Sequence, residues 1–113
     1  MKLSPALSSQ LQTQIEHSFI PLTQVEQVSL AILAQRGDLR AKGLLVKNQS
    51  KNLYERVYAF AKNESQLDDL IGEGVLGIYQ AIKHFDVEGA ASFDEVASLW
   101  VHASLIRIAN LRT

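Results

Sequence analysis

The glycines at positions 72, 74 and 77 have a spacing that could form a ligand-binding site. Gly72-Glu-Gly74-Val-Leu-Gly77 matches the G-x-G-x-x-G fingerprint, in which backbone amides at the start of a helix bind pyrophosphate after a strand. Here a helical apolar period already begins at Leu67, and the adjoining Asp68 and Asp69 would repel phosphate. Each glycine inside a helix costs about 1 kcal/mol relative to alanine. We therefore predict close approach of another backbone at these glycines, and no nucleotide site.

No group of titratable side chains has the spacing of a catalytic or metal site. Cysteine is absent from the 113 residues, which excludes disulfides, thiolate metal sites and a cysteine nucleophile. His17, His84 and His102 fall in different predicted helices, without the spacing of metal ligands. The carboxylates of Asp68, Asp69 and Glu73 fit a solvated face as well as an acid–base pair. We expect no enzyme activity, no metal and no cofactor.

The composition is that of one folded domain without a strong electrostatic bias. Hydrophobic residues make up 47% of the chain and charged residues 20%, which is too apolar for a disordered tail. The 12 acidic and 11 basic side chains leave a net charge of −1, so no charge excess indicates nucleic acid or an anionic membrane. No apolar run reaches the roughly 18 residues of a membrane span, and the N-terminus lacks a signal peptide's apolar stretch. We expect a soluble cytoplasmic domain with no membrane partner.

Helical patterns and capping residues predict an all-α fold, a compact bundle of four to five helices. Both prolines lie in the first fifth of the chain, which leaves the remainder open to long helices. Thr23-Gln-Val-Glu26 is a capping box, and Gly37 can end the helix that it opens. A further helical stretch covers residues 38–62, and a break is possible at Asn48-Gln-Ser50.

The clearest helix is predicted for residues 65–85, opened by a capping box at Ser65-Gln-Leu-Asp68. Its apolar residues follow the i, i+3, i+4, i+7 rule and predict a stripe facing the core: Leu67, Leu70, Ile71, Gly74, Val75, Ile78, Ala81, Ile82 and Phe85. The opposite face combines acidic residues with an exposed leucine and tyrosine, a composition that fits a protein-docking surface or a solvated face. Its residues are Asp69, Gly72, Glu73, Leu76, Tyr79, Gln80 and Lys83. A third capping box, Ser92-Phe-Asp-Glu95, predicts a last helix that runs to the chain end.

The segments of these last two helices resemble region 2 of bacterial RNA polymerase sigma factors. The resemblance is carried by Asp69-Leu-Ile-Gly-Glu-Gly74, Gly77-Ile-Tyr-Gln-Ala-Ile82 and Phe85-Asp86, and then by Phe93 followed by Ala97 and Trp100. It covers about residues 22–110. We accordingly divide the chain into an N-terminal arm or short helix at 1–21, with the helix expected near Ser9–Ser18, and a region 2-like domain at 22–113.

The resemblance implies a role in transcription initiation. The face from Asp69 to Lys83 would dock on the coiled coil of the largest subunit of core RNA polymerase. The last helix would face the promoter −10 element, with weak DNA contacts expected at Phe93, Trp100, His102 and Arg107. Aromatic side chains of this kind stack on unpaired bases, which any π-face can do and an aliphatic group cannot. At helical spacing, Phe93 and Trp100 fit a core position as well as a base platform.

Several residues depart from the family pattern. Gly72 replaces a glutamine, Val96 a tyrosine, Leu99 a tryptophan and His102 an arginine. From Gly89 to the end, two arginines balance two acidic residues, whereas a surface that follows phosphates needs a positive excess. The departures indicate weakened DNA reading.

Three functional hypotheses remain open. The first is a sigma-like initiation factor that binds polymerase and helps to recognise or open the −10 element. The second is an interaction module that binds polymerase, or a second polypeptide supplying the −35-reading domain, and regulates transcription without reading DNA. The third is a structural domain with unrelated partners. The sequence alone leaves open whether the chain is a complete protein or a piece of a longer sigma factor.

Overall fold

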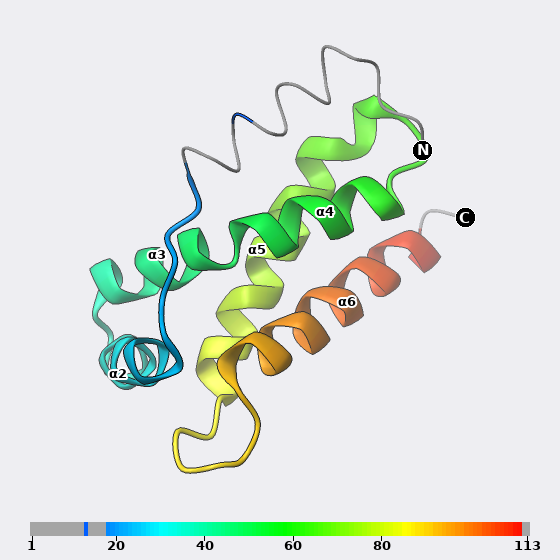
Figure 1. Cartoon of the computed structure of the whole chain (residues 1–113). Helices are drawn as coiled ribbons and strands as arrows, with labels where there is room; N and C mark the ends of the chain where they lie inside the picture. Colours follow the sequence, from blue (N-terminus) through cyan, green and yellow to red (C-terminus); the bar gives the residue numbers. More distant parts are fainter. Residues whose placement is uncertain (1–12, 14–17, 112–113) are drawn as a thin grey trace.

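The computed structural model describes Thr13 and residues 18–111, and these residues form a helical bundle (Figure 1). The elements are α2 (Gln24–Gln35), α3 (Leu39–Asn48), α4 (Ser50–Phe60), a short 3-10 turn η1 (Glu64–Gln66), α5 (Leu67–His84) and α6 (Phe93–Leu111). The described part of the chain contains no strand. The predicted all-α class is therefore confirmed. The helix expected near Ser9–Ser18 lies almost entirely outside the described residues, and the domain division at residue 21 stays a prediction.

The first described helix begins and ends as its capping residues predict. The Thr23 hydroxyl accepts from the Glu26 amide at 3.1 Å, and the Glu26 carboxylate accepts from the Thr23 amide at 2.9 Å. These hydrogen bonds hold the pKa of Glu26 below its ordinary value, with the bond from the Thr23 backbone as the largest cause. Gly37 follows the helix with φ of 99°, the left-handed conformation that favours glycine. The chain then turns directly into α3, so α2 and α3 pack together.

A break divides the stretch predicted at 38–62, at the place that the sequence indicated. α3 ends at Asn48 and α4 begins at Ser50, with Gln49 between them. The three polar residues at the break are buried rather than solvated: Asn48 is 7% exposed, and Gln49 and Ser50 are each 4% exposed. Buried polar groups need hydrogen-bond partners, so the break is fixed by what these side chains contact.

Those contacts form a polar network that joins α2, the α3–α4 break, α6 and the residues before α2. The Asn48 side-chain oxygen accepts from the Gln27 amide at 2.8 Å and from the Gln49 amide at 3.0 Å. One carboxylate oxygen of Asp94, on α6, accepts from the same two amides at 2.8 Å. The Asn48 side-chain amide donates to the carbonyl of Ile20 at 2.7 Å. The network therefore ties the residues before α2 to α2, to the α3–α4 break and to the start of α6.

The start of α5 differs from the prediction. The capping box expected at Ser65-Gln-Leu-Asp68 does not form, because Ser65 lies inside the 3-10 turn and donates to the Asn63 side chain at 2.5 Å. Helix α5 begins at Leu67, and its cap residue Gln66 makes no side-chain cap bond to the helix. The Gln66 side chain instead accepts from the backbone amide of Lys62 at 2.9 Å. The polar pattern there stabilises the turn between α4 and α5.

The core lies mainly between α5 and α6, which run side by side (Figure 1). The predicted α5 stripe faces it, with Ile78 and Ala81 at 0% exposure and Ile82 at 2%. At the start of α6, the Ser92 hydroxyl accepts from the Glu95 amide at 3.1 Å, which is one of the two hydrogen bonds of the capping box predicted there. Within the described residues no helix is long and apolar enough to cross a membrane.

Candidate functional site

The predicted docking residues lie on the side of α5 that faces away from the core. We call this surface the α5 outer face; it comprises Asp69, Gly72, Glu73, Leu76, Tyr79, Gln80 and Lys83. Leu76 is 52% exposed and Tyr79 is 41% exposed. Six of its seven residues are exposed, and only Glu73 is half-buried. A large aliphatic and an aromatic side chain are thus presented to solvent from a rigid helix, an arrangement typical of protein-binding surfaces.

Glu73 has a partner on the neighbouring helix. Its carboxylate lies 3.0 Å from the Arg107 guanidinium of α6, and the side chains are 23% and 64% exposed respectively. The family resemblance implies a polymerase-binding role for Glu73 and a DNA-binding role for Arg107. The structure brings these two residues into one ion pair at the α5–α6 junction. At this exposure the pair contributes at most about 1 kcal/mol, so it orients both groups without holding the helices together.

Two of the three α5 glycines explain how closely the neighbouring helices approach. A Cβ at Gly77 would lie 2.9 Å from the Trp100 carbonyl oxygen and 3.0 Å from the Val101 Cα. A Cβ at Gly74 would meet the Leu53 side chain of α4, whereas one at Gly72 would meet nothing within 4 Å. The predicted close approach of another backbone therefore occurs at Gly77. At Gly74, the missing side chain leaves room for the side chain of Leu53. Gly72 lies on the solvent side, where no neighbour requires a glycine.

A groove extends the α5 outer face toward the turn between α2 and α3. It encloses about 570 Å³ and is lined by Tyr79, Gln80 and Lys83 together with residues near Gly37. The Lys42 ammonium of α3 lies 5.7 Å from the centre of the Tyr79 ring, within the range of a cation–π contact. Sequence reasoning missed Lys42, because its periodicity places it on α3 and nothing in the sequence pairs it with α5.

The carbonyls at the end of α5 are capped by a side chain from α2. The Gln35 amide donates to the Ile82 carbonyl at 2.9 Å and to the Phe85 carbonyl at 2.8 Å. Carbonyls in the last turn of a helix have no partner within the helix. This contact fixes the position of the groove relative to α5.

The structure removes Phe93 from the expected DNA surface. Phe93 is 1% exposed, and its ring packs edge-to-face on Phe85 with the centroids 5.4 Å apart. A ring with so little exposed area has no face on which a base could stack. Trp100 is half-buried, and it stacks on His84 with centroids 4.8 Å apart and planes 11° apart. One face of the indole is therefore already covered by an imidazole from α5.

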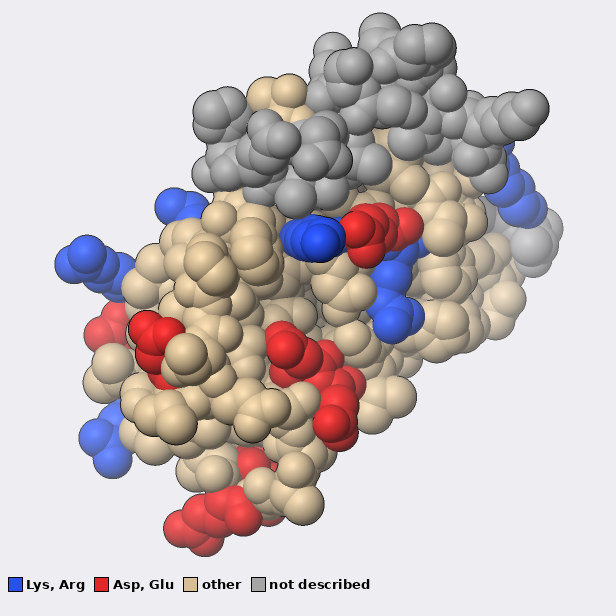
Figure 2. All heavy atoms as spheres, in the orientation of Figure 1, with Lys and Arg blue, Asp and Glu red and all other residues tan. Residues whose placement is uncertain are grey.

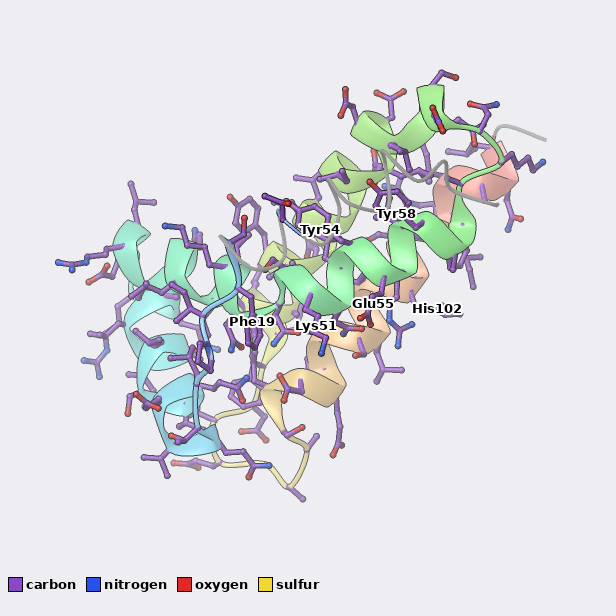
Figure 3. All side chains as sticks on the ribbon, turned by 45° about the horizontal axis from the view of Figure 1, so that its top comes forward. Phe19, Lys51, Tyr54, Glu55, Tyr58 and His102 are labelled. Atoms are coloured by element: carbon purple, nitrogen blue, oxygen red, sulfur yellow. The ribbon has the colours of Figure 1, made fainter. Side chains whose placement is uncertain are left out.

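His102 is exposed and lies beside α4 (Figure 3). The Arg56 guanidinium is 3.5 Å from its Nδ1, and the Phe60 ring is 5.5 Å away in an edge-on arrangement. Arg56 brings a basic group next to α6 that sequence reasoning missed. A shallow groove of about 590 Å³ lies alongside, lined by Arg56, Asp94, Glu95, Ser98, Leu99 and His102.

The solvent side of α6 mixes aliphatic with polar and charged side chains. Leu99 is 70% exposed, Ile106 is 40% exposed and Ala103 lies between them at the surface. Figure 2 shows basic and acidic side chains scattered among each other over the face in view. That face has no continuous basic strip of the kind that follows a phosphate backbone.

The family model of sigma-70 region 2 matches residues 45–109, which include α4, α5 and most of α6. The RNA polymerase sigma factors SigA of Listeria monocytogenes and of Listeria innocua are each 28% identical to this chain over 86 residues. The aligned part is 76% of this chain and 23% of each SigA. The chain therefore spans less than a quarter of the length of these relatives.

Proposed function

The chain belongs to the sigma-70 region 2 family, and from this premise we propose that it acts in transcription initiation by docking on core RNA polymerase through the α5 outer face. The observation that carries this proposal is the exposure of Leu76 and Tyr79, at 52% and 41%, on a helix that lies wholly within the residues matched by the family. The role is one of binding, in the cytoplasm, where the polymerase acts. The coiled coil of the polymerase's largest subunit is the docking partner that the family resemblance implies.

The chemistry of the α5 outer face supports a helical protein partner. Leu76 and Tyr79 offer apolar area, and Asp69, Gln80 and Lys83 surround them with charged and polar groups, as in an interface with a dry centre and a polar rim. Exposed Gly72 in the same surface lets a partner's backbone approach α5 closely. Lys42, held against Tyr79, extends the surface onto α3.

Exchange of Leu76 for a charged residue tests this surface. We expect Leu76→Asp to abolish co-elution with core polymerase in size-exclusion chromatography, because a desolvated charge at the interface centre has no partner. Leu39→Asp is the matched control, since Leu39 is also an exposed helical leucine, at 76%, on α3. Circular dichroism should show equal helicity in both. Undiminished binding by the Leu76 variant would remove the docking role of this face.

The Glu73–Arg107 ion pair allows a second, independent test. Glu73→Ala and Arg107→Ala break the same intramolecular contact. We expect only Glu73→Ala to weaken polymerase binding, by roughly tenfold, because a charged contact at an interface is worth about 1.4 kcal/mol or more. Equal weakening by both variants would mean that the ion pair matters for the fold and that Glu73 makes no contact to polymerase.

A second candidate function is favoured by α6. Phe93 is buried, Trp100 has one face covered, and Arg107 is paired with Glu73. The surface left for −10 DNA combines exposed aliphatic side chains, such as Leu99 and Ile106, with the acidic residues Asp94 and Glu95, and its basic groups are His102 and Arg56 at one edge. This supports a module that binds polymerase, or a second polypeptide carrying the −35-reading domain, and regulates initiation without reading the −10 sequence itself.

Binding of a fluorescent non-template −10 oligonucleotide separates the two candidates. For the regulatory module we expect weak binding that falls steeply with salt and is the same for a scrambled sequence, because phosphate contacts supply it. Arg56→Ala should reduce this binding, since its guanidinium is the basic group beside the helix. Tight binding that a scrambled oligonucleotide does not reproduce would establish −10 recognition by the chain itself.

A further inference from the structure

The groove between α3 and α5 is lined by positive charge without any negative charge. Its volume is about 570 Å³, and its lining comes from the end of α2, the α2–α3 turn, α3 and the last part of α5. The charged side chains of the lining are Lys42 and Lys83, and no carboxylate belongs to it. Neither lysine forms an ion pair within the described part of the chain. Two positive groups without a carboxylate partner therefore line one hollow.

The acidic residues that adjoin the lining in sequence are engaged by their own turns. Asp38 caps α3 through its carboxylate, which accepts from the Ala41 amide at 2.9 Å. After α5, the Asp86 carboxylate accepts from the Glu88 amide at 3.0 Å. The described residues thus supply no counter-charge to the groove, and an anion from outside the chain is the group that its lining complements.

The position of Lys42 is not explained by the stability of its own helix. Lys42 is the fourth residue of α3, whose first turn holds no acidic side chain. A positive charge near the start of a helix opposes the helix dipole, which favours anions there. Lys83, in contrast, lies in the last turn of α5, where a cation suits the dipole. Helix α3 gains no stability from the charge of Lys42, which lies over the Tyr79 ring at 5.7 Å and borders the groove.

The groove is continuous with the α5 outer face. Tyr79, Gln80 and Lys83 belong to both. Leu76 and Lys83 are seven residues apart, which is about 10 Å along α5. A partner helix that covers Leu76 therefore extends over the groove within two of its own turns.

We propose that the groove binds an acidic side chain of the helical partner that docks on the α5 outer face. The partner's carboxylate pairs with the ammonium groups of Lys42 and Lys83, and such charged contacts fix the register of two docked surfaces. The inference rests on the proposed docking function and adds to it the sign of the partner's charge at this point.

Charge reversal of the two lysines tests the proposal, with core polymerase binding to the full chain measured by biolayer interferometry. We expect Lys42→Glu and Lys83→Glu each to raise the Kd at least tenfold, because each sets a carboxylate against the partner's carboxylate. Lys42→Arg keeps the charge and should keep the affinity. Lys47→Glu is the matched control, an exposed lysine of α3 outside the lining, and it changes the net charge of the chain by the same amount.

The outcomes separate this proposal from the docking function on which it rests. Lys42→Glu places an acid near the start of α3, where the dipole favours it, so lost binding cannot be ascribed to a weakened helix. Parent-like binding by both reversal variants, with binding lost in Leu76→Asp, would overturn the groove proposal and leave the docking function standing. Equal weakening by Lys47→Glu would reduce the effect to overall charge and overturn it as well. Parent-like binding by all of these variants, Leu76→Asp included, would remove both.

Variants of the polymerase identify the acidic group. When the acidic residues of the coiled coil are changed to lysine one at a time, one variant should bind the Lys83→Glu chain more tightly than it binds the parent chain. The absence of any such variant would overturn the acidic partner. Saturable binding of inorganic pyrophosphate to the chain alone, lost in Lys42→Glu while polymerase affinity is unchanged, would assign the groove to a small anion instead.

Discussion

Gly77 shows how a single missing side chain decides the distance between two helices. The backbone of α6 lies within 3.0 Å of where a Cβ would be, while Gly72, one and a half turns earlier, has open space. The two glycines share a helix and differ only in what they face. They therefore form a matched pair for measurement.

We expect Gly77→Ala to destabilise the fold and Gly72→Ala to stabilise it. The first forces α5 and α6 apart, at a cost of about 1–3 kcal/mol. The second gains helix propensity without a clash, about 0.5–1 kcal/mol. Urea denaturation followed by circular dichroism measures both. A Gly77→Ala variant as stable as the parent would mean that the helices separate at no cost.

The Thr23–Glu26 capping box makes the stability of the fold depend on pH. The folded-state pKa of Glu26 lies below its ordinary value, mainly because its carboxylate accepts from the Thr23 amide. A lowered pKa stabilises the fold when the group is ionised, and this contribution is lost as the pH falls through the folded-state pKa.

We therefore expect Glu26→Ala to lower the melting temperature at neutral pH, and this deficit to shrink in acid below the ordinary carboxylate pKa. Thermal unfolding at a series of pH values measures the deficit. Gln24→Ala in the same helical turn is the control, because it removes no ionisable group. A deficit that is constant with pH would show that the ionised carboxylate contributes nothing.

At the scale of elements, the sequence pattern predicted helices α2 and α5 well, but it did not predict the 3-10 turn that precedes α5. The capping box at Thr23 succeeds because its hydrogen bonds are local and complete. The one at Ser65 fails because Asn63 competes for the serine hydroxyl and a 3-10 turn results. Sequence spacing cannot rank two local partners of similar strength. The α5 outer face was predictable from periodicity, whereas the contributions of Lys42 and Arg56 arise from other helices and were not.

The α5 core stripe gives a sharp prediction for this helix. Ile78 is 0% exposed and Leu76 is 52% exposed, two residues apart. We expect Ile78→Ala to lower the free energy of unfolding by about 2–5 kcal/mol, because it leaves a cavity. Leu76→Ala should change it by less than about 0.5 kcal/mol. Equal losses of unfolding free energy in the two variants would mean that α5 is rotated about its own axis relative to the structure.

At the scale of the whole molecule, the polar network around Asn48 makes the bundle one cooperative unit. Its four side chains connect the residues before α2 with α2, the α3–α4 break and α6. The sequence predicted the break but not the network, because a run of Asn, Gln and Ser fits a solvated loop equally well. Only burial, which depends on the packing of distant helices, distinguishes the two.

We expect Asn48→Ala to destabilise the whole domain by about 2 kcal/mol or more. The change leaves the Gln27 and Gln49 amides with one acceptor fewer and the Ile20 carbonyl without its donor, and unsatisfied buried groups are costly. Unfolding should remain a single transition by circular dichroism and by fluorescence. Gln80→Ala, at an exposed site on α5, is the control and should change stability little. Two separate transitions in the parent chain would show that the network does not couple the helices.

The stacking of Trp100 on His84 gives the protein a built-in optical probe. The chain has a single tryptophan, and its indole lies 4.8 Å from an imidazole at the end of α5. Tryptophan emission therefore originates at the junction of α5 and α6. A movement of α5 relative to α6 changes the surroundings of the indole, and with them the wavelength or intensity of its emission. Docking on the α5 outer face can therefore be followed in real time without an added label.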